Sequence, residues 1–123
     1  MVGTVVIIDD HEDIQAILKE VLEEEGYDVA VASDGKQGLR VLRSTRQPCV
    51  ALLDLLMPVM TGYELMAAMR DDPYLSVIPV IVLSANVRDE RELMMPGVAA
   101  VFRKPVDPYD LFKALEKVMP LPH

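Results

Sequence analysis

The stretch that decides the fold is CVALLD, Cys49 to Asp54, which continues as LLMPVMTG up to Gly62. A continuous apolar run closed by one carboxylate is typical of a strand that is buried on both faces of a parallel sheet. A buried carboxylate without a partner destabilises a protein. Asp54 is therefore expected either at the mouth of the fold, where the strand ends, or paired with cationic groups.

The same alternation of strand and helix extends in both directions from this run. Besides Cys49–Asp54, the strand-like segments are Thr4–Asp9, Tyr27–Ala32, Ile78–Ala85 and Val98–Phe102. Each of them leads into a helical pattern of apolar residues. Five such units predict an α/β fold, a doubly wound five-stranded parallel sheet with helices on both faces.

The predicted helices have recognisable ends. Gly26 should terminate the first helix, whose apolar stripe is expected on Ile14, Ile17, Leu18, Val21 and Leu22. Asp34 should cap the second helix, and Tyr63–Arg70 and Val87–Met95 should form the third and a short fourth. Asp107 as N-cap and Pro108 at the first position predict the start of the last helix.

Composition excludes several classes of function. The 123 residues fit one domain, expected over residues 1–119, with 120–123 as a tail or the start of a linker. The net charge of −8 opposes direct binding to nucleic acid. No apolar run reaches the roughly 18–20 residues that cross a membrane, and no signal peptide is recognisable. The single cysteine, Cys49, suits a reducing compartment, so we expect a cytoplasmic protein.

Chemically active residue types stand at four of the five strand ends. They are Asp9 and Asp10, Asp54, Ser84 and Lys104. In a doubly wound sheet these ends share one edge, where ligands bind. Taken singly, each residue has an ordinary explanation, such as helix capping for the aspartate pair. Taken together, three clustered acids would repel one another, and a divalent cation such as Mg²⁺ would relieve that repulsion.

The motifs IIDDHED, LLDLLMPVMTG, VIVLSA and FRKP together give the chain a resemblance, along its whole length, to the receiver domains of two-component response regulators. The resemblance implies a flavodoxin-like strand order, 2-1-3-4-5. It also implies a signalling phosphoacceptor rather than an enzyme, one that takes a phosphoryl group from a histidine kinase or phosphotransfer protein. An output domain or downstream protein would read the signal, and the chain would be a monomer or weak dimer.

The resemblance also implies roles for individual residues. Asp54 would be the phosphoacceptor. Asp10 would bind Mg²⁺ directly and Asp9 through water, with Asp54 and the backbone carbonyl of Leu56 as further ligands. The Ser84 hydroxyl would bind a phosphoryl oxygen.

The remaining implied roles concern the lysine and the loops. Lys104 would pair with the phosphoryl group, Pro105 would follow it through a cis peptide bond, and Pro58 and Gly62 would shape the loop beside the acceptor. His11 and His123 are interpreted as exposed and incidental.

Other functions fit the residues less well. A flavin binder would need a hydroxyl- and glycine-rich loop where this chain has DDHED, and a dinucleotide binder would need G-x-G-x-x-G after the first strand. An aspartate-based phosphatase would want a second carboxylate at the position of Leu56. The alternative kept open is a pseudo-receiver, a phosphorylation-independent protein interaction module.

The intact acidic site argues against that alternative, but a departure from the family pattern keeps it open. Receivers usually carry Tyr or Phe three residues before the lysine, a position that Val101 occupies here. The nearby Phe102 should point to the opposite face of the sheet, because side chains alternate along a strand. An aromatic rotamer switch is therefore not expected.

Overall fold

The computed structural model describes residues 3–57, 59–85 and 97–119. Its strands are β1 (Thr4–Ile8), β2 (Asp28–Ala32), β3 (Cys49–Asp54), β4 (Val80–Ser84) and β5 (Val98–Arg103). They form one parallel sheet in the order β2-β1-β3-β4-β5, which confirms the expected fold class and strand order. The bounds of β3 are those predicted, and the ends of the other strands lie within two residues of the predicted ones, the usual uncertainty of element boundaries.

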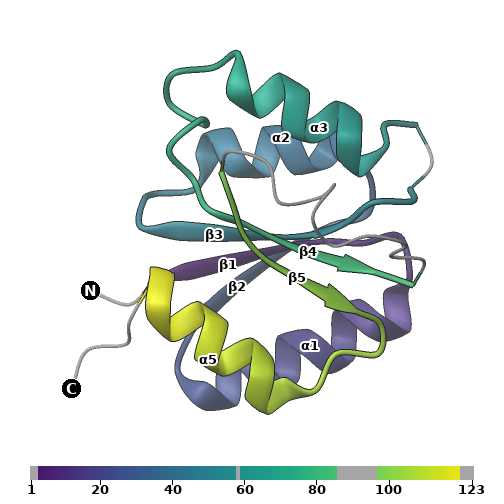
Figure 1. Cartoon of the computed structure of the whole chain (residues 1–123), viewed down its shortest axis with the longest axis vertical. Coiled ribbons are helices and arrows are strands. Elements are labelled where there is room, and N and C mark those ends of the chain that lie inside the picture. The colour runs from purple at the N-terminus through teal and green to yellow at the C-terminus, as the bar shows by residue number, and fades with distance from the viewer. Residues whose placement is uncertain (1–2, 58, 86–96, 120–123) are drawn as a thin grey trace.

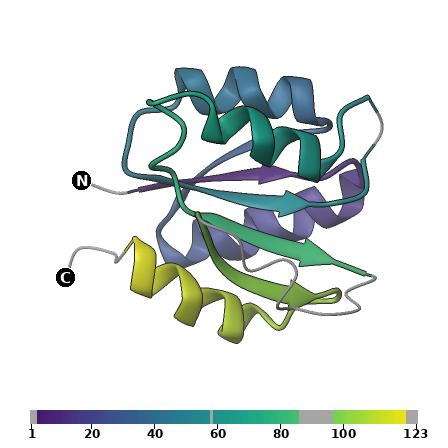
Figure 2. The ribbon, with the colours of Figure 1, turned by 45° about the horizontal axis from the view of Figure 1, so that its top comes forward.

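Helices cover both faces of the sheet. The described helices are α1 (Glu12–Glu25), α2 (Gly35–Ser44), α3 (Gly62–Arg70) and α5 (Pro108–Val118). Helices α2 and α3 lie on one face, and α1 and α5 on the other (Figures 1 and 2). The predicted fourth helix, Val87–Met95, lies outside the described residues. In the described part of the chain, no helix has the length and hydrophobicity to span a bilayer.

The sheet divides the core into two apolar layers. All six residues of β3 are buried, and successive side chains enter opposite layers, as the uninterrupted run predicted. Ala51 and Leu53 pack with α2 and α3, whereas Val50 and Leu52 pack with α1 and α5. Burial on both faces makes β3 the centre of the fold, so its last residue, Asp54, is held by a rigid support.

The predicted helix ends are confirmed. Gly26 ends α1 in the left-handed conformation, with φ of 109°. Asp34 caps α2 by accepting a hydrogen bond from the Gln37 amide. The Asp107 side chain caps α5 by accepting a hydrogen bond from the Tyr109 amide, and a proline occupies the first helical position.

The apolar stripe predicted for α1 is partly wrong. Ile17 is 62% exposed, whereas Gln15 is buried together with Leu18 and Leu22. A polar residue therefore occupies a core-facing position of α1, next to the loop that carries Asp9. Helical spacing of apolar residues predicts Ile17 on the inner face, because hydrophobicity takes no account of the hydrogen bonds that a buried Gln15 can form.

Candidate functional site

The carboxyl ends of the strands bring four possible metal ligands together. One ligand atom from each of Asp9, Asp10, His11 and Asp54 lies within 4.8 Å of the other three. Asp9 and Asp10 follow β1 directly, and Asp54 is the last residue of the adjacent β3. The parallel pairing of these strands explains the cluster, since it places both carboxyl ends at one edge of the sheet. This cluster could hold a metal ion.

A lysine that follows the edge strand β5 reaches into the same cluster. Lys104 follows β5, and its Nζ lies 2.7 Å from Oδ2 of Asp9 and 3.4 Å from Oδ2 of Asp54. Its backbone amide donates to the carbonyl of Ser84, which ties the end of β5 to the end of β4. The peptide bond between Lys104 and Pro105 is cis, as the family resemblance implied.

The three charged groups shift one another's pKa values. Burial opposes ionisation of Asp9, but the hydrogen bonds from Lys104 and from His11 outweigh it and lower the pKa of Asp9. Burial raises the pKa of Asp54, with a further contribution from the negative charge of Asp9. Burial alone would lower the pKa of Lys104, yet the two carboxylates raise it. Lys104 is therefore a permanent cation whose stronger partner is Asp9.

Asp10 is the member of the cluster that fits a metal ligand best. Its Oδ1 is shielded from solvent and accepts no hydrogen bond from any described residue, although His11 Nδ1 lies 3.3 Å away. Both oxygens of Asp9, by contrast, already have partners, namely His11 and Lys104. Unsatisfied carboxylate oxygen beside two further carboxylates is the donor set that Mg²⁺ takes in proteins. The residues present therefore fit a hard divalent cation.

Gln15 is a part of the site that the sequence interpretation missed. Its buried amide nitrogen donates to the carbonyl of Asp9, to the carbonyl of Ala32 at 3.2 Å and to the hydroxyl of Ser33 at 3.3 Å. These bonds fasten the loop after β1 to the end of β2. A glutamine in line with Leu18 and Leu22 on one helix face is the sequence signal that could have identified it.

The loop after β3 approaches Asp54 closely. The amide of Leu56 donates to Oδ1 of Asp54 at 3.3 Å, and the amide of Gly62 donates to the carbonyl of Leu55 at 3.0 Å. A side chain at Gly62 would meet the carbonyl oxygen of Asp54 at 2.7 Å. Glycine at this position lets α3 start directly against the end of β3. Pro58 lies outside the described residues, and the proposed role of the Leu56 carbonyl stays a prediction.

The ends of β4 and β5 place the remaining predicted site residues. Ser84 is the last residue of β4 and is buried. Val101 packs against the layer that contains α2 and α3, whereas Phe102 packs against the layer that contains α1 and α5. The predicted opposite orientation of these two side chains is thus confirmed.

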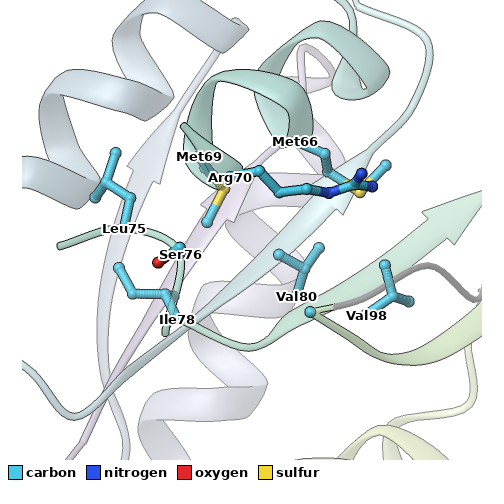
Figure 3. A pocket seen from close by; sticks show the side chains of 9 residues that line it. Met66, Met69, Arg70, Leu75, Ser76, Ile78, Val80 and Val98 are labelled. Atoms are coloured by element: carbon cyan, nitrogen blue, oxygen red, sulfur yellow. The ribbon is translucent and has the colours of Figure 1, made fainter. Parts of the chain in front are cut away.

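A small cavity lies away from these strand ends. It has a volume of about 20 Å³ and is bounded mainly by apolar side chains from α3, from the segment between α3 and β4, and from the first residues of β4 and β5 (Figure 3). Among the labelled residues, Val80 and Val98 begin β4 and β5 (Figure 3). The volume accommodates roughly one water molecule, and its position at the opposite edge of the sheet separates it from Asp54.

Comparisons with known proteins agree with this arrangement. Residues 5–116 match the response regulator receiver domain. A protein of Leptolyngbya boryana, described as an uncharacterized 14.6 kDa protein in the sodA1 3′ region, is 32% identical over 115 residues, or 92% of this chain and 87% of that one. The chemotaxis protein CheY4 of Vibrio cholerae has a similar structure, with a TM-score of 0.86 and 29% identity, covering 97% of this chain and 100% of that one.

A third similar structure contains a metal. It is the receiver domain of sensor histidine kinase PA1611 from Pseudomonas aeruginosa PAO1, with a magnesium ion coordinated in its active-site cleft. The TM-score is 0.84 at 25% identity, and the match covers 95% of this chain and 97% of that one.

Proposed function

Because this chain belongs to the response regulator receiver domain family, we propose that it accepts a phosphoryl group on Asp54 from the phosphohistidine of a histidine kinase or phosphotransfer protein. The observation that carries the proposal is the position of Asp54. Its carboxylate ends the central strand, beside the Lys104 ammonium at 3.4 Å and within the cluster that contains Asp9 and Asp10. A nucleophilic carboxylate next to a fixed cation is suited to phosphoryl transfer.

In the proposed reaction a carboxylate oxygen of Asp54 bonds to phosphorus while the phosphorus–nitrogen bond to the donor histidine breaks. The electron pair of the broken bond stays on the imidazole, which leaves. The carboxylate itself is the proposed nucleophile, so the reaction needs no general base. Burial raises the pKa of Asp54, and the Lys104 charge and the hydrogen bond from the Leu56 amide oppose that rise. The product is an acyl phosphate with a charge of about −2.

The main obstacle to this reaction is repulsion between the carboxylates and the incoming phosphoryl group. Lys104 offsets part of it from its position between Asp9 and Asp54. The Ser84 hydroxyl, at the end of the neighbouring strand, is proposed to donate to a phosphoryl oxygen. Asp10, Asp54 and the Leu56 carbonyl, with Asp9 acting through water, would hold Mg²⁺, which supplies positive charge that offsets the charge of the transferring group.

The biological setting is part of the same proposal. The chain would be a signalling phosphoacceptor that promotes only its own phosphorylation and slow dephosphorylation. Its phosphorylated form would change its interactions with an output domain or a downstream protein, in the cytoplasm. The charge of the acyl phosphate would act on the residues around Ser84 and Lys104, biasing a two-state equilibrium of that end of the sheet.

The test uses a small phosphodonor in place of the kinase. Wild-type protein and the Asp54→Asn variant are incubated with acetyl phosphate, with Mg²⁺ or with a chelator, and intact masses are measured. The wild type should gain the mass of one phosphoryl group in the presence of Mg²⁺ and none in the presence of the chelator. The variant should gain none under either condition. Equal incorporation in both proteins would refute the assignment of Asp54. No incorporation in the wild type would favour the phosphorylation-independent interaction module.

A further inference from the structure

The imidazole of His11 lies in the carboxylate cluster, a position that the interpretation of this residue as exposed and incidental does not include, although the ring is exposed as expected. Its Nδ1 is 2.8 Å from Oδ1 of Asp9 and 3.3 Å from Oδ1 of Asp10. The side chain is 55% exposed, so the ring lies at the solvent boundary of the cluster. As the N-cap of α1, His11 makes no side-chain capping bond, which leaves its ring turned toward the carboxylates.

We propose that His11 is a nitrogen ligand of the cation at this site, and that the site therefore binds first-row transition-metal ions such as Ni²⁺ or Co²⁺ more tightly than Mg²⁺. The inference rests on the proposed function in so far as that function assigns the cation to Asp10. It adds a ligand and a preference among metals that the three carboxylates alone would not provide.

The spacing of the two donor atoms supports chelation. Two donors that each lie about 2.0–2.2 Å from one ion, at angles between octahedral and tetrahedral, are roughly 2.8–3.6 Å apart. The 3.3 Å between Asp10 Oδ1 and His11 Nδ1 falls within this interval. Both atoms belong to the group of four whose members all lie within 4.8 Å of one another.

The hydrogen bonds around the pair leave it available to an ion. Oδ1 of Asp10 accepts no hydrogen bond from the described residues. If the His11 ring turns from Asp9 to an ion, Oδ1 of Asp9 keeps the bond from the His11 backbone amide at 2.9 Å. Oδ2 of Asp9 keeps the bond from Lys104. Binding through His11 and Asp10 therefore leaves no buried charge of Asp9 without a partner.

The chemistry of the donors determines the preference among metals. Carboxylate, carbonyl and water oxygens suit Mg²⁺, whereas imidazole suits Zn²⁺, Cu²⁺ and Ni²⁺. Divalent first-row metals also bind nitrogen-containing sites more tightly along the series from Mn²⁺ to Cu²⁺. A single imidazole added to this acidic cluster should thus raise the affinity for Ni²⁺ and Co²⁺ and change that for Mg²⁺ little.

Isothermal titration calorimetry with Ni²⁺ and with Mg²⁺, on protein that carries no histidine tag, tests the proposal. The proteins are wild type, His11→Ala and His123→Ala. His123 is the second of the two histidines in the sequence and lies outside the described residues, so its variant controls for loss of an imidazole elsewhere. His11→Ala should weaken Ni²⁺ binding by at least about tenfold, the lower end of what loss of even an outer partner of a ligand costs. The ratio of Ni²⁺ to Mg²⁺ affinity should fall with it, and His123→Ala should leave that ratio unchanged.

An unchanged Ni²⁺ affinity in His11→Ala, or an equal loss of Ni²⁺ and Mg²⁺ affinity, would overturn the proposal. A measurement on the wild type guards against an effect of the substitution on folding: Co²⁺ should shift the NMR signals of the His11 ring protons strongly, and no shift would overturn the proposal as well. These titrations contain no phosphodonor. If they fail while Asp54 still becomes phosphorylated with Mg²⁺, only the role of His11 is wrong.

Discussion

The ammonium of Lys104 lies 2.7 Å from Oδ2 of Asp9, and this contact joins the end of β5 to the end of β1 across the two strands between them. The Asp9 side chain is 3% exposed and that of Lys104 14%. The pair is therefore formed largely out of solvent, at the edge where the candidate site lies. Four predictions follow from this geometry and that of the adjoining loop.

Lys104→Ala should lower the free energy of unfolding of the metal-free protein at pH 7 by about 1–3 kcal/mol, because it leaves buried carboxylates without their cation. The hydrogen bond from Lys104 helps lower the pKa of Asp9, so Asp9 adds stability above the ordinary pKa of 3.8. This contribution is lost as the pH falls through the lowered pKa.

The difference between wild type and Lys104→Ala should therefore shrink in acid, which denaturant titrations at several pH values would measure. Lys36→Ala, at an exposed position on α2, is the matched control and should change stability by less than about 0.5 kcal/mol. Equal stability of the Lys104 variant and the wild type at pH 7 would contradict the prediction.

Asp54→Asn should stabilise the metal-free protein at neutral pH. Burial raises the pKa of Asp54, so folding favours its protonated form. The stability that this residue adds is complete below the ordinary pKa of 3.8 and is lost as the pH rises through the raised pKa. An uncharged asparagine avoids that loss. In the presence of a chelator, the melting temperature of the variant should exceed that of the wild type at pH 7. The two melting temperatures should converge below the ordinary pKa of 3.8. A lower melting temperature of the variant at pH 7 would contradict the prediction and show that the ion pair with Lys104 dominates.

Gly62→Ala should disturb the site through the backbone. The added Cβ would meet the carbonyl oxygen of Asp54 at 2.7 Å and the Cα of Leu55 at 2.8 Å, neither of which belongs to a flexible side chain. We expect a loss of about 1–3 kcal/mol of stability, typical of overpacking, and slower phosphorylation by acetyl phosphate. Chemical denaturation would measure the stability, and mass spectrometry over time would measure the rate of phosphorylation. Wild-type values for both would contradict the prediction and show that the loop moves to accommodate the added methyl group.

Val59→Gly should stabilise the protein by about 0.5–1 kcal/mol, because a β-branched residue at positive φ is strained by more than glycine loses in chain entropy. Val59 has φ of 69° and is 71% exposed, so removing its side chain sacrifices little burial. Val77→Gly is the matched control, at a valine that is 66% exposed and does not have positive φ. The Val77→Gly substitution should destabilise the protein. If both substitutions stabilise the protein, or if neither does, backbone strain at Val59 is not the cause.

The sequence was sufficient for the fold because each unit is locally consistent. The run through β3 is apolar without a break, and Gly26, Asp34 and Asp107 mark helix ends by their own conformational and hydrogen-bonding preferences. Parallel pairing then brings Asp9 and Asp54 to one edge, so the acidic cluster could be predicted as well.

The parts of the site that could not be predicted depend on contacts between loops. The position of the His11 ring is set by the turn after β1, and no periodic pattern specifies that turn. Gln15 is buried because its side-chain amide donates hydrogen bonds to the carbonyl of Asp9, after β1, and to the carbonyl of Ala32, at the end of β2. A hydrophobicity pattern does not detect such bonds. Hydrophobicity alone likewise predicts Ile17 on the inner face of α1, although this residue is exposed.

The measurement that tests the proposed role of Asp54 most directly is chemical mapping of the phosphorylated residue. Wild-type protein is phosphorylated with acetyl phosphate and Mg²⁺, treated with borohydride, which reduces an acyl phosphate to an alcohol, and digested for peptide mass spectrometry. The proposal predicts homoserine at position 54 and unmodified aspartate at positions 9 and 10. Reduction at Asp9 or Asp10, or a stable phosphate on a hydroxyl residue with Asp54 unchanged, would contradict it.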